Sequence, residues 1–134
     1  MWRDHPLIGV GLDNFLYQYR GRYILANAWQ EPNLNHPHQI LLDFGTRLGL
    51  LGVLAGTWLF TTLLSSLVSR LSSKPKDPLV IGLLGSAVYM LAHGLVDHSF
   101  FLIDLAYLFY FVLGSAVWFL ETPTQPDSSP TMET

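Results

Sequence analysis

Two histidines that flank a proline, His36 and His38, are the residues of this chain best suited to proton-transfer chemistry. Pro37 suits the first turn of a helix, because it has no N–H to leave unpaired and its φ is already helical, so a helix is predicted from about Pro37. His38 then lies in the first turn, where the positive end of the helix dipole favours a neutral imidazole. Since a neutral imidazole can accept a proton, His38 is a candidate general base.

Three arginines are candidates for binding a diphosphate beside this base. Arg47 lies on the same predicted helix, and Arg20 and Arg22 lie in the preceding loop. Two other interpretations of the histidine pair stay open. The pair is compatible with a plain polar helix start at the level of lipid headgroups, and with a metal site, for which two close histidines without further ligands are weak evidence. We therefore expect no metal and no cofactor.

A run of glycines follows the histidines. If the helix is unbroken at about 100° per residue, four glycines share one narrow stripe; they are Gly45, Gly49, Gly52 and Gly56. A stripe of this kind lets another backbone approach closely. Asp43 and Arg47 fall on the opposite face, in the acid-first order that favours an ion pair. One side of the helix is thus predicted to pack and the other to carry charge.

A second group of ionisable residues lies between two later apolar stretches. His93 and Asp97 are four residues apart, and Asp104 follows about one turn into the next predicted helix. Ionisable groups inside a membrane are costly and by default suggest a lined cavity or a functional pair. A structural hydrogen bond between His93 and Asp97, with Asp104 reaching the interface, is the simpler interpretation. A polar relay in a small transporter or channel is the other.

The composition indicates a membrane protein. Half of the 134 residues are hydrophobic, only 13% are charged and the mean hydropathy is +0.33, whereas soluble domains are about a quarter charged. Three runs lack charge: residues 48–69, 79–96 and 105–120. A helix that crosses the hydrocarbon core needs roughly 20 apolar residues. The sequence predicts an all-α integral membrane protein whose three spans are residues 48–70, 79–97 and 100–120.

The predicted spans organise the rest of the chain. Residues 1–35 form a loop region with short helices, in which Asp13 or Asn14 could cap a helix carrying Phe15. Residues 36–120 form the membrane helices, and residues 121–134, rich in proline, serine and acid, form a disordered tail. Because each span reverses the chain direction, the segment around Asp97 is expected on the same side as the two histidines.

Charge and composition also restrict orientation and partners. Near the predicted membrane ends, residues 70–76 carry three basic side chains, whereas the other side has Arg47. The positive-inside rule then places this short loop and the tail in the cytoplasm and the histidines outside. The sequence has no basic patch with interleaved aromatic residues, so no nucleic-acid partner is expected. The absence of cysteine excludes disulfides and thiolate metal sites.

The segment HPLIGVG at residues 5–11, followed by Asn14 and Phe15, and then His38-Gln39, nine residues and Gly49 resemble the C-terminal signature of the O-antigen ligase and O-antigen polymerase superfamily. In the ligases this histidine, an Asn, Ser or Gln, nine residues, a glycine and a threonine three positions later mark the catalytic region. Gly52 stands at the threonine position, which leaves polymerase-like and other relatives open. Residues 93–104 also look like the closing helix hairpin of the family.

The resemblance implies glycosyl transfer without metal or nucleotide at the outer face of a bacterial inner membrane, in the synthesis of lipopolysaccharide or another envelope polysaccharide. The donor would be a glycan on a polyprenyl diphosphate. His38 would take the proton of the acceptor hydroxyl, Arg47 would be the second catalytic residue, and the substrate-binding residues would be Arg20, Arg22, His36 and Gln39.

Members of this family carry many more membrane helices, so the chain looks like the C-terminal part of such an enzyme. It would then depend on a complementary helical half or on further copies of itself. The alternative is a non-enzymatic membrane subunit, or a remnant, that packs with a partner through its glycine-striped helix.

Overall fold

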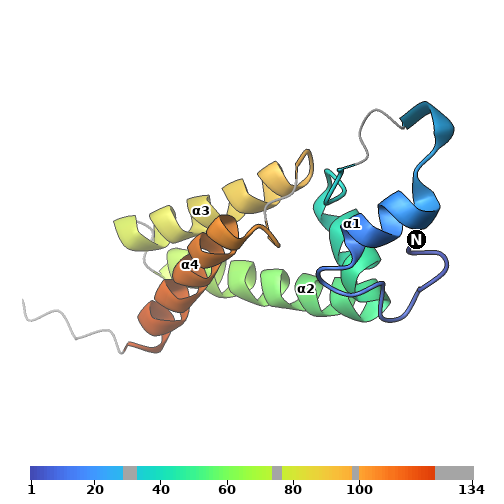
Figure 1. Ribbon diagram of the computed structural model, residues 1–134. Helices are drawn as coiled ribbons and strands as arrows, with labels where there is room; N and C mark the ends of the chain where they lie inside the picture. The colour runs from blue at the N-terminus through green and yellow to red at the C-terminus, as the bar shows by residue number, and fades with distance from the viewer. Residues whose placement is uncertain (29–32, 74–76, 98–99, 123–134) are drawn as a thin grey trace, which may run out of the picture.

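The computed structural model describes residues 1–28, 33–73, 77–97 and 100–122, and within these ranges it is helical with no strand (Figure 1). The N-terminal region holds a short helix α1 (Phe15–Gln18), a π-helical turn (Tyr19–Tyr23) and a 3₁₀ turn (Ala26–Ala28). Three long helices follow: α2 (Ile40–Ser73), α3 (Pro78–Gly94) and α4 (Ile103–Glu121). The all-α prediction is confirmed. The predicted disordered tail lies almost entirely outside the described residues.

Two of the three predicted spans are long and apolar enough to cross a membrane by length and composition, namely α2 and α4. Only 22% and 17% of the residues in their most apolar windows are buried, whereas the core helices of soluble proteins are mostly buried. Large side chains such as Trp58, Phe111 and Trp118 stand exposed on them. The third, α3, has 17 residues, at the lower end of the lengths that span a bilayer.

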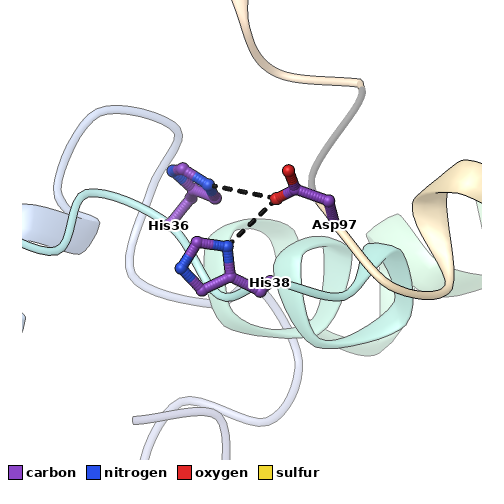
Figure 2. A group of neighbouring side chains, drawn as sticks. All are labelled: His36, His38 and Asp97. Carbon is purple, nitrogen blue, oxygen red and sulfur yellow. Dashed lines mark hydrogen bonds and ion pairs between the residues drawn. The ribbon is translucent and has the colours of Figure 1, made fainter.

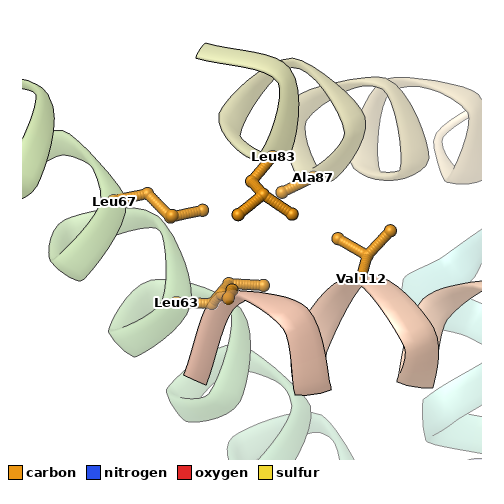
Figure 3. Packing of buried hydrophobic residues seen from close by; sticks show 6 residues of the cluster. Leu63, Leu67, Leu83, Ala87 and Val112 are labelled. Carbon is orange, nitrogen blue, oxygen red and sulfur yellow. The ribbon is translucent and has the colours of Figure 1, made fainter. Parts of the chain in front are cut away.

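The three long helices pack together through small and branched residues. Figure 3 shows one cluster, to which α2 contributes Leu63 and Leu67, α3 contributes Leu83 and Ala87, and α4 contributes Val112 and Ala116. A second, aromatic cluster lies toward the histidine end and includes Phe44, Phe60, Met90, Phe100 and Phe109. The aromatic cluster supports the chain where the functional candidates gather.

Helix α2 is broken at Gly49, which has φ +68° and ψ −161°, and Figure 1 shows the helix changing direction. In an unbroken helix the amides of Leu50 and Leu51 would donate to the carbonyls of Thr46 and Arg47. Here residues 6–11 enter the break and pair with all four groups. The bonds are Val10 N to Thr46 O (2.8 Å), Gly11 N to Arg47 O (2.9 Å), Leu50 N to Pro6 O (2.7 Å) and Leu51 N to Leu7 O (3.2 Å).

The crossing of the two backbones requires glycine on both sides. A Cβ on Gly49 would lie 2.4 Å from the backbone of Leu7, and a Cβ on Gly9, which has φ +66°, would lie 2.4 Å from the backbone of Arg47. The prediction of one straight helix with a continuous glycine stripe is therefore wrong. The other three glycines of the predicted stripe also face this chain, at Trp2 (Gly45), Leu48 (Gly52) and Phe44 (Gly56). The stripe consequently presents no open surface within the described residues.

The start of α2 also differs from the prediction. The helix begins at Ile40 rather than Pro37, because the Gln39 side chain provides the cap: its Oε1 accepts from the amide of Leu42 at 2.7 Å. His38 therefore lies before the helix and not in its first turn. Helix α1 does follow Asn14 as predicted, but the Asn14 amide donates to Val10 O and does not cap the helix.

Candidate active site

His36, His38 and Asp97 meet at the end of the bundle where α2 begins and α3 ends (Figure 2). Asp97 Oδ1 lies 3.0 Å from His38 Nδ1 and 3.7 Å from His36 Nε2. The two imidazole rings contact each other edge to face, with centroids 4.7 Å apart. The expectation that the segment around Asp97 lies on the same side as the histidines is confirmed for Asp97.

The carboxylate defines how His38 can act. Asp97 Oδ1 accepts a hydrogen bond from Nδ1, so in the neutral ring Nε2 carries the lone pair. Figure 2 shows this second nitrogen pointing away from Asp97. The His38 side chain is 59% exposed, so Nε2 can be reached from outside the chain. A histidine held in this tautomer by a carboxylate has the geometry of a general base.

His36 is more enclosed than His38, with a side chain only 16% exposed. Its Nδ1 is hydrogen-bonded to the side-chain Oδ1 of the preceding residue, Asn35. This bond turns the opposite edge of the ring, with Nε2, toward Asp97. Asn35 is a site residue that the sequence interpretation missed, although its position next to the HPH sequence was a usable signal.

Arg47 is buried, and each of its guanidinium nitrogens has a partner within the chain. Nε donates to Asp43 Oδ1 at 2.7 Å, one terminal nitrogen donates to Leu12 O and the other to Asn35 O at 2.9 Å. The predicted ion pair with Asp43 is thus confirmed, but it is wrong that these residues form an open charged face, because Asp43 is fully buried. The contacts make Arg47 a tie between α2 and the N-terminal region.

A pocket of about 420 Å³ lies beside this arginine. Its lining residues come from α1, α2 and the start of α4 and from the segments just before these helices: Asp13, Leu16, Tyr17, Asn35, His36, Arg47, Phe101, Leu102 and Ile103. The pocket combines polar groups with an apolar wall, as ligand sites usually do. Asp13 and Tyr17 had no predicted role in the site, since only tertiary contacts bring α1 against the histidine segment.

Of the predicted site residues, only His36 and Arg47 line this pocket; His38, Gln39 and Asp97 do not. Arg20 and Arg22 are exposed on the π-helical turn and do not line it. His93 stacks on Tyr89 with ring centroids 6.0 Å apart, and its carbonyl accepts from the Asp97 amide at 2.9 Å. Asp104 is exposed in the first turn of α4. The Asp97 carboxylate thus belongs with the two N-terminal histidines.

Outside the site, a contact between Asp4 and Tyr23 shifts the pKa values of both groups. The Tyr23 hydroxyl donates to Asp4 Oδ2 at 2.6 Å. This hydrogen bond lowers the pKa of the Asp4 carboxyl and raises the pKa of Tyr23. The contact ties the π-helical turn to the first residues of the chain.

In the part of the chain that the structure describes, the fold is all-helical, with two candidate membrane spans and a His-His-Asp group at one end of the bundle. Comparison of the chain with family models, with curated proteins and with solved structures found no match. The resemblance to O-antigen ligases and polymerases therefore stands on the motif residues alone.

Proposed function

We propose that this chain is the C-terminal part of a bacterial inner-membrane glycosyltransferase similar to the O-antigen ligases and polymerases. The observation that carries the proposal is the pairing of His38 with Asp97, which are 59 residues apart in the sequence. His38 is the histidine that matches the ligase motif. The contact with Asp97 favours the tautomer of a base, and the side chain is exposed enough to meet an acceptor. The exposed apolar surfaces of α2 and α4 would face membrane lipid.

The reaction uses the dyad as follows. As the acceptor oxygen attacks the anomeric carbon of the donor glycan, His38 Nε2 takes the hydroxyl proton, and the bond between that carbon and the diphosphate oxygen breaks. The diphosphate leaves as an anion on its polyprenyl carrier. Asp97 holds the ring in orientation and stabilises the imidazolium that forms. Neither a metal nor a nucleotide enters this step.

The pocket limits what the chain does alone. A volume of about 420 Å³ suits a sugar ring or a diphosphate, but not a whole lipid-linked glycan. The polyprenyl groove would be completed by a complementary helical half. Arg47 lines the pocket, but its guanidinium nitrogens are held by Asp43, Leu12 and Asn35. Its role would therefore be to shape the pocket, and Arg20 and Arg22, which are exposed on the π-helical turn, stay the proposed contacts of the diphosphate.

The test is glycan transfer in membranes of a ligase-deficient bacterium that expresses the chain together with the N-terminal helices of an O-antigen ligase. His38→Ala should lower transfer by about 10² to 10⁴, the usual contribution of a general base, and Asp97→Asn should lower it while the protein stays in the membrane. His93→Ala is the matched control, because the His93 side chain stacks on Tyr89 and belongs neither to the group of His36, His38 and Asp97 nor to the pocket lining. Transfer that persists in His38→Ala would contradict the proposal.

A further inference from the structure

We propose that His36, His38 and Asp97 form a binding site for a divalent transition metal, with Zn²⁺ the best match. One ligand atom from each residue lies within 4.8 Å of the other two. The residues come from two distant parts of the chain, the segment before α2 and the segment after α3. The binding site stands on this geometry and does not depend on the glycosyltransferase proposal.

The distances suit a four-coordinate ion. Ligands about 2.0–2.1 Å from Zn²⁺ in a tetrahedron lie roughly 3.4 Å from one another. The distances of 3.0 Å and 3.7 Å from Asp97 Oδ1 to the two imidazole nitrogens bracket that value. The widest separation in the group, at most 4.8 Å, requires a contraction of up to about 1.4 Å to reach this value, which rotation of the exposed His38 side chain can supply.

The donor set favours Zn²⁺ over the abundant hard cations. Two imidazoles and one carboxylate match a catalytic or open zinc site, in which three protein ligands leave a fourth position for water. Magnesium and calcium prefer sites made of oxygen ligands. An ion at this site would also be accessible from outside the chain, because the side chains of His38 and Asp97 are both at least half exposed.

The surroundings orient the ligands as metal sites require. The Asn35 side chain is hydrogen-bonded to Nδ1 of His36 and so directs Nε2 inward. A hydrogen bond to the other ring nitrogen is the usual outer contact of a metal-bound histidine. Pro37 fixes the backbone between the two histidines, which limits the freedom lost on binding.

Metal at this site would compete with proton transfer, a consequence that does rest on the proposed function. A metal on His38 Nδ1 takes the place of the proton there, and the single proton of the neutral ring is then on Nε2. That nitrogen can donate a hydrogen bond but cannot accept the hydroxyl proton. Zinc is thus expected to inhibit, not to assist, glycosyl transfer.

The experiment is titration calorimetry of the full chain, without a histidine tag and in detergent micelles, with ZnCl₂ as the probe. We expect one zinc per chain, no binding of Mg²⁺, and binding weakened by more than about 100-fold in Asp97→Asn and in His36→Gln, because even loss of an outer contact costs 10- to 100-fold. His93→Ala should bind as the unaltered chain does. Helix content measured by circular dichroism shows that each variant is folded.

Two results would overturn the inference. One is the absence of saturable zinc binding by the unaltered chain. The other is binding that survives in both Asp97→Asn and His36→Gln or that is lost equally in His93→Ala. Because no glycan is involved, a failure of glycosyl transfer leaves this measurement unaffected, and a failure of zinc binding leaves the transfer assay unaffected.

Discussion

Replacing Gly49 by alanine should release residues 6–11 from the break in α2. At φ +68° and ψ −161°, the backbone of Gly49 is in a region that is essentially restricted to glycine, and a side chain there costs about 1–3 kcal/mol. The added Cβ would also lie 2.4 Å from the carbonyl group of Leu7. Relieving that contact weakens the bonds from Leu50 and Leu51 to this segment, each worth about 1 kcal/mol.

The released state also gains from the substitution. With residues 6–11 gone, α2 can close its own two hydrogen bonds across position 49, and alanine favours that helix by about 0.5–1 kcal/mol over glycine. The combined shift toward release is about 3.5–6 kcal/mol, which corresponds to at least about 100-fold in the equilibrium constant.

Hydrogen exchange of the full chain in micelles measures this release. The amides of Val10 and Gly11, which donate to α2 in the intact structure, should exchange about 100-fold faster or more in Gly49→Ala. Gly82→Ala is the matched control, because nothing lies within 4 Å of its added Cβ, and it should leave this exchange unchanged. Equal protection of Val10 and Gly11 in the two variants would refute the reasoning.

Three further predictions concern buried and hydrogen-bonded groups. Asp43→Asn should lower the free energy of unfolding by about 3–5 kcal/mol in a denaturant titration, because Arg47 would keep a buried charge without its counterion; an unchanged midpoint would contradict this. Tyr23→Phe should raise the pKa of Asp4 in an NMR titration, since the hydroxyl that lowers it is removed. The pKa of Asp4 is lowered in the folded chain, so the stability that Asp4 contributes is fully present above its unfolded pKa, near 3.8. That contribution is lost as the pH falls from there through the folded pKa. Over this pH range, proteolysis of the N-terminal segment should increase in the unaltered chain and not in Tyr23→Phe. Ala87→Leu should destabilise the helix bundle by about 1–3 kcal/mol through overpacking, measured by thermal unfolding, whereas Val88→Leu on the exposed face of α3 should not.

Part of the site was predictable because it follows from chain topology. The apolar runs implied that each helix reverses the chain, so the segment at Asp97 had to return to the histidine end, as it does. The ion pair of Asp43 with Arg47 was predictable for a similar reason, since residues four apart on a helix are neighbours. The pattern could not predict that this ion pair is buried, because the N-terminal region that covers it is distant in the sequence.

Local pattern was sufficient for the helical class, for the order of the three long helices and for the identity of the candidate base, since hydrophobic runs and motif spacing are properties of neighbouring residues. Tertiary structure alone decided the break at Gly49, because a helix tolerates the loss of two hydrogen bonds only where other backbone groups replace them. It also decided that Asp97 belongs with His36 and His38 and not with a relay along α3 and α4. Side chains from segments about 60 residues apart meet only through packing of the helices between them.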